Sequence, residues 1–80
     1  MDNIADDKDL GPQPLDLMMT QLGLSNADLV HASTEQVSFK MVQKARRGRR
    51  LSRSVQQKIL RALQSAAKSD VYSLQGLFNY

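Results

Sequence analysis

Apolar residues recur at helical spacing along this chain, and that periodicity restricts its fold more than any other feature. In segments 14–22, 34–46 and 54–67, apolar residues repeat three or four positions apart, as on one face of a helix. No segment of useful length alternates apolar and polar residues in the manner of a half-buried strand. The sequence therefore predicts an all-α domain of four to five small helices.

Residues that favour helix ends separate these segments. Pro14 suits a first helical turn, where its missing N–H would have had no partner, and Gly23 suits a C-terminal cap. We therefore expect the first helix over 14–22. Ser52 or Ser54 can cap the helix expected over 54–67.

Two further helices are expected between these. Ser25 or Asn26 can cap a short helix, and Ser33 begins a capping-box pattern that predicts a third helix over 34–46. Two short helices with almost no linker must meet at a steep angle. The sequence therefore predicts a helix-turn-helix over about 25–47.

The two ends of the chain differ in composition. Segment 1–13 holds four aspartates, few large apolar groups and a Gly11–Pro12 break, which predicts a disordered acidic tail. Residues 14–80 are then expected to form one helical domain. The apolar residues of 71–80 should be covered. This segment is expected either to fold back over the first and fourth helices or to pair with a second copy.

Charge is distributed unevenly along the sequence. Seven basic residues and no acidic residue lie from Lys40 to Arg53. Such a density of like charge points to a polyanionic partner. A helix fits the major groove of B-DNA but not the deep, narrow major groove of A-form RNA. Duplex DNA is therefore the expected partner.

Two roles are expected within the basic region. Side chains near the start and on the outer face of helix 34–46 are candidates for reading bases: Thr34, Gln36, Ser38, Lys40 and Gln43. Cations at the end of this helix and in the loop behind it are candidates for binding phosphates: Lys44, Arg46, Arg47, Arg49, Arg50 and Arg53.

Nothing in the sequence indicates catalysis. The chain has no cysteine and a single histidine, His31, which is expected to be a partly exposed helix residue. Isolated glycines give no phosphate-cradling loop. We therefore expect no enzymatic activity, no cofactor and no metal. No apolar run is long enough to span a bilayer, and we expect a cytoplasmic protein, associated with the nucleoid if it is bacterial.

The order of these elements resembles the phage repressor and Cro type of helix-turn-helix, the lambda-repressor-like family. The resemblance covers about 14–67 and is carried by Leu24–Ser25 with Leu29–Val30 and by Arg47–Gly48–Arg49. It implies a small transcriptional regulator that binds duplex DNA, with a homodimer on a pseudo-palindromic site as a candidate assembly. It also implies base contacts early in the third helix, which by position are Thr34, Gln36, Val37, Ser38 and Lys40.

Two other functions fit the same sequence. An RNA-binding or ribosome-associated protein would use the arginine-rich segment 44–53. A protein-interaction module of the antitoxin type would dock through the apolar segment 71–80. No second domain is expected to sense a ligand, so no small-molecule effector is inferred.

Overall fold

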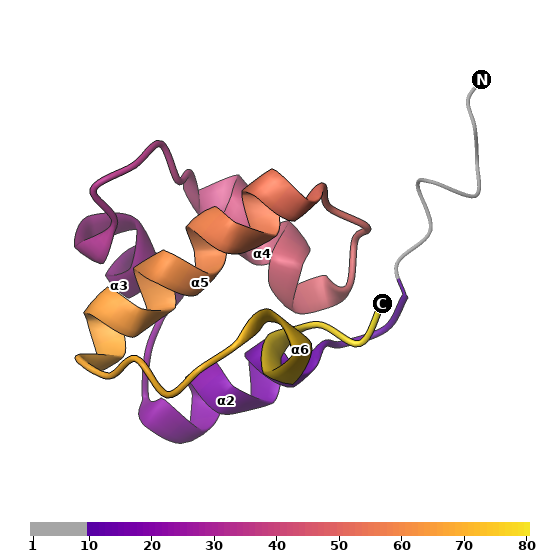
Figure 1. Ribbon diagram of the computed structural model, residues 1–80, viewed down its shortest axis with the longest axis horizontal. Helices are drawn as coiled ribbons and strands as arrows, with labels where there is room; N and C mark the ends of the chain where they lie inside the picture. The colour runs from indigo at the N-terminus through magenta and orange to yellow at the C-terminus, as the bar shows by residue number, and fades with distance from the viewer. Residues whose placement is uncertain (1–9) are drawn as a thin grey trace.

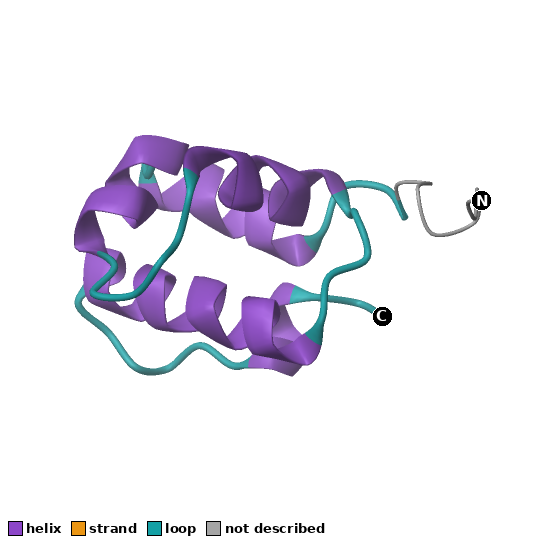
Figure 2. Ribbon diagram, turned by 90° about the horizontal axis from the view of Figure 1, so that it is seen from above, coloured by secondary structure: helices purple, strands orange, loops and turns teal. Residues whose placement is uncertain are grey.

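The computed structural model describes residues 10–80, which form five helices and contain no strand (Figures 1 and 2). The helices are α2 Pro14–Leu22, α3 Asn26–Ala32, α4 Phe39–Arg47, α5 Arg53–Ala67 and α6 Leu74–Leu77. The prediction of an all-α domain with four to five helices is confirmed. None of the helices described has both the length and the apolar character needed to cross a membrane.

The first helix begins and ends where the sequence predicts, and the second begins there. Pro14 opens α2, and Gly23 closes it in the left-handed region with φ of 72°. The Ser25 hydroxyl accepts a hydrogen bond from the Asp28 amide, while the Asp28 carboxylate accepts one from the Ser25 amide. This reciprocal cap uses two amides that have no partner within α3.

The start of the third predicted helix is wrong, because α4 begins at Phe39 rather than at residue 34. The Ser33 hydroxyl does not cap a helix: it bonds the amide and the carbonyl of Glu35, two residues along. Such local serine bonds compete with helix formation. The Ser38 hydroxyl instead accepts from the Met41 amide at 3.1 Å and caps α4. Six residues, 33–38, therefore separate α3 from α4, and a tight helix-turn-helix is not confirmed.

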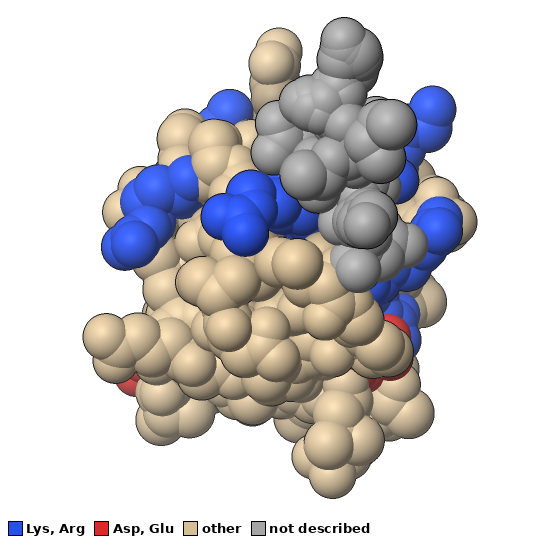
Figure 3. Space-filling view, turned by 90° about the vertical axis from the view of Figure 1, so that its right-hand side faces the viewer, with Lys and Arg blue, Asp and Glu red and all other residues tan. Residues whose placement is uncertain are grey.

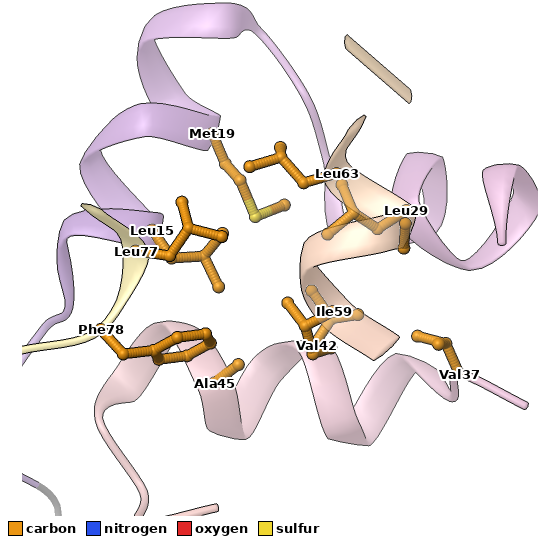
Figure 4. Close-up of a cluster of buried hydrophobic side chains, with 11 residues drawn as sticks. Leu15, Met19, Leu29, Val37, Val42, Ala45, Ile59, Leu63, Leu77 and Phe78 are labelled. Carbon is orange, nitrogen blue, oxygen red and sulfur yellow. The ribbon is translucent and has the colours of Figure 1, made fainter. Parts of the chain in front are cut away.

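Every helix contributes to one apolar core. Leu15 and Met19 of α2 and Leu77 of α6 point toward Leu63 of α5 and Leu29 of α3, and all five are fully buried (Figure 4). The rest of the core is formed by Val37, Val42, Ala45, Ile59, Ala62 and Phe78. Because the core is small, its stability depends on every segment that contributes to it, including the short helix α6.

The C-terminal segment folds back, as the first of the two expected arrangements requires. Helix α6 lies beside α2 and contacts both α2 and α5 (Figure 1). Leu77 and Phe78 are buried. Val71, at the start of the segment, is 78% exposed. Pairing of two copies through this segment stays a prediction.

The expected disordered tail, 1–13, falls largely on residues 1–9, which lie outside the described part of the chain. Residues 10–13 are fixed against the end of α4. The Leu10 amide donates to the Gly48 carbonyl at 2.8 Å, and the Gln13 amide donates to the Arg46 carbonyl. The Gln13 side chain is buried, with its amide group bonded to Gly11 and Asn79. The ordered domain therefore includes Leu10 and the residues that follow it.

Candidate nucleic-acid interface

One face of α4 carries a compact polar stripe. Successive residues are displaced by about 100° around a helix, so four side chains share an arc of about 100°: Lys40, Gln43, Lys44 and Arg47. Val42 and Ala45 lie on the opposite side of the axis and are fully buried. The separation predicted between a buried face and a basic face of this helix is therefore present in the structure.

The positive surface continues from α4 into a short loop. We call residues 48–52 the arginine loop; it joins α4 to α5 and contains Arg49 and Arg50. Gly48 closes α4 in the left-handed region with φ of 94° and turns the chain toward α5. Figure 3 shows the right-hand side of the molecule as drawn in Figure 1. Lysine and arginine side chains lie across the upper part of this face, and the lower part is largely uncharged.

Arg46, one of the predicted phosphate-binding residues, has its guanidinium engaged within the protein. Its Nε donates to Asp16 at 2.6 Å, its Nη1 to Asn26 at 2.8 Å and its Nη2 to Thr20 at 3.3 Å. The side chain is only 20% exposed. Arg46 thus fixes α4 against α2 and α3, which gives it a role in the fold.

The predicted base-reading residues fall into two groups. Lys40 and Gln43 lie exposed on α4, within the polar stripe. Thr34 and Gln36 are exposed in the connection between α3 and α4, and Ser38 uses its hydroxyl as the cap of α4. The structure therefore brings two of the five onto one helix face and leaves the others before the helix begins.

An ion pair holds the connection between α3 and α4 against α5. Both terminal oxygens of Glu35 accept from Arg61, at 2.6 Å from Nε and 2.8 Å from Nη2. These hydrogen bonds lower the pKa of Glu35 below its ordinary value and raise the pKa of Arg61. Such a two-pronged contact fixes direction as well as distance. The connection is thereby positioned without belonging to a helix.

A groove opens beside the start of α4. Its volume is about 450 Å³, and Val37, Met41 and Val55 form its apolar floor. Gln36 and Lys58 add polar groups to its lining. Phe39, the first residue of α4, is 56% exposed.

Nothing in the described residues forms a metal centre. No three histidine, aspartate or glutamate side chains among residues 10–80 come together in a way that could hold an ion. His31 is exposed on α3, as expected for an ordinary helix residue.

Tyr80 is the residue at this face that sequence patterns did not single out. Its hydroxyl accepts from the Leu51 amide and donates to the Arg49 carbonyl, both at 3.1 Å. The guanidinium carbon of Arg50 lies 5.9 Å from the centre of its ring. No local signal could have predicted these contacts, because about thirty residues separate the two segments and only the fold-back of the C-terminal segment joins them.

Comparisons with known proteins gave no relative: no family model, no curated protein and no solved structure matches this chain. The functional interpretation therefore depends on the geometry and charge of the residues described above.

Proposed function

We propose that this protein binds duplex DNA sequence-specifically, as a small transcriptional regulator, with α4 in the major groove. The observation that carries the proposal is the polar stripe of α4 and its continuation into the arginine loop. Lys40, Gln43 and Arg47 are all exposed on that stripe. Glutamine can bond adenine through two hydrogen bonds, and lysine or arginine can bond guanine or phosphate.

The dimensions of α4 support this assignment. Nine residues give a helix of about 13–14 Å, and a helix is the element that the major groove of B-DNA admits. The buried face of α4 rests on the core, so its polar stripe is turned outward. The exposed start of the helix, at Phe39 and Lys40, would approach the bases first, as in other recognition helices.

We further propose that α3 and α4 act together as a helix-turn-helix with a long connection. The two helices contact each other, and the hydrogen bond from Arg46 to Asn26 fixes their relative position. In this arrangement α3 crosses the DNA backbone while α4 enters the groove. Arg50 and Arg53, in the arginine loop and at the first residue of α5, would contact phosphates beside the groove.

The test is to select bound duplexes from a random pool and then to measure variants on the selected and a scrambled site. Gln43→Ala should weaken binding to the selected duplex by about 1–3 kcal/mol and relax the preferred sequence. Arg50→Ala should weaken both duplexes about equally, since phosphate contacts carry no sequence information. Gln57→Ala, an exposed glutamine on α5, is the matched control and should change neither.

Two outcomes would contradict the proposal. Recovery of no common sequence from the pool would remove the claim of specificity. Preferential binding of a structured RNA in direct competition with the selected duplex would indicate the RNA-binding alternative, in which the arginine loop and the end of α4 carry the interaction.

A further inference from the structure

The last residues of the C-terminal segment contact the arginine loop. The Tyr80 hydroxyl bonds one backbone group on each side of Arg50: the carbonyl of Arg49 and the amide of Leu51. The Tyr80 ring also lies beneath the guanidinium of Arg50, with 5.9 Å between the guanidinium carbon and the ring centre. That distance is within the range of a cation–π contact.

Tyr80 is itself held in place by its neighbours. Its ring packs edge-on against Phe78, which is buried in the core, with 5.8 Å between ring centres. The amide of Asn79 donates to the buried Gln13 side chain at 2.8 Å. Because these contacts hold Tyr80 in place, its ring can restrain the arginine loop.

The N-terminal segment holds the start of the same loop and the end of α4. The Leu10 amide bonds the Gly48 carbonyl, and the Gln13 amide bonds the carbonyl of Arg46. Gln13 thus links the end of α4 to the C-terminal segment. These bonds leave the arginine loop few conformations, although it carries charges that repel one another.

We propose that Tyr80 is a positioning residue, which holds the arginine loop in its nucleic-acid-binding conformation before the ligand arrives. This rests on the proposed function. A loop that is already ordered loses less conformational entropy on binding, and the smaller entropy cost makes the binding free energy more favourable. Tyr80 itself need not touch the nucleic acid, because it acts through the backbone around Arg50.

The test compares Tyr80→Phe with Tyr72→Phe in the full chain. The first variant removes the hydroxyl and keeps the ring; the second removes a tyrosine hydroxyl from a partly buried residue outside the arginine loop. Amide hydrogen exchange of Leu51 should become about two- to tenfold faster in Tyr80→Phe, the range expected for one lost hydrogen bond. Duplex affinity should fall by a similar factor on selected and scrambled sites alike. Tyr72→Phe should change neither.

The outcomes separate the two proposals. Faster exchange at Leu51 with unchanged duplex affinity would overturn the positioning role, and so would unchanged exchange at Leu51. If the wild-type protein binds no duplex, the proposed function is wrong, and so is the inference that Tyr80 raises duplex affinity. The exchange measurement still decides in that case whether Tyr80 orders the loop.

Discussion

Gly48 is the residue whose substitution tests the described packing most sharply. It closes α4 with φ of 94°, a conformation that residues with a side chain rarely adopt. A Cβ added there would overlap the Gly11 carbonyl oxygen and lie 2.9 Å from the Gly11 carbonyl carbon. Gly48→Ala must therefore accept a strained backbone and also displace the segment that runs past the end of α4.

The two effects can be estimated separately. The left-handed conformation costs a residue with a Cβ roughly 1–2 kcal/mol. Displacing Gly11 breaks the hydrogen bond between Leu10 and Gly48, whose loss costs about 0.5–1.5 kcal/mol. The free energy of unfolding should thus fall by about 2.5 kcal/mol. In a domain of this size that corresponds to a melting temperature lower by roughly 10–20 °C.

Gly23→Ala is the matched control, because Gly23 also closes a helix in the left-handed region but has no atom within 4 Å of an added Cβ. Thermal unfolding should show Gly48→Ala to be more destabilising than Gly23→Ala by about 1 kcal/mol. Removing residues 1–11 from both variants should erase that difference, since the clash is then absent. Equal melting temperatures for the two full-length variants would contradict the packing described.

Three further predictions concern other parts of the molecule. Glu35→Gln should lower the melting temperature above pH 4.5, the ordinary pKa of this group. The difference in melting temperature between variant and wild type should disappear as the pH falls through the lowered pKa of Glu35. A difference that does not change with pH would argue against the ion pair with Arg61. Truncation after Ser69 removes the buried Leu77 and Phe78, each worth about 1.5–3 kcal/mol, so calorimetry should show a large loss of stability, and an unchanged transition would refute the fold-back. Replacing the four aspartates of residues 1–9 by asparagine should strengthen duplex binding, because acidic side chains repel phosphates and can compete with them for basic groups. Weaker binding of this variant would contradict the expectation.

Local sequence signals predicted the helices where the candidate caps lay at or next to the true end. Pro14 and Gly23 define α2, and Ser25 defines the start of α3. The start of α4 was mispredicted because two serines, Ser33 and Ser38, stand five residues apart and both can cap. In the structure, the connection between the two serines is held against α5 by the ion pair between Glu35 and Arg61, a contact across 26 residues that local patterns do not contain.

The candidate interface was predictable to a similar extent. The run of cations and the separation of basic from buried positions on α4 follow from composition and periodicity. The assignment of Arg46 to the fold does not, because its partners Asp16, Thr20 and Asn26 lie on two other helices. The contacts of Tyr80 could not be predicted from local sequence either, since only the packing of α6 brings Tyr80 to the arginine loop.

The salt dependence of duplex binding tests whether the basic face of α4 and the arginine loop binds DNA. The proposal counts five phosphate contacts, at Lys44, Arg47, Arg49, Arg50 and Arg53, and leaves out Arg46, which fixes α4 against α2 and α3. Each neutralised phosphate contributes about −0.9 to the slope of log affinity against log salt concentration, so the account predicts a slope of about −4.5. Fluorescence anisotropy of a labelled duplex over a series of salt concentrations measures it. A slope near zero would contradict the claim that this basic face binds DNA.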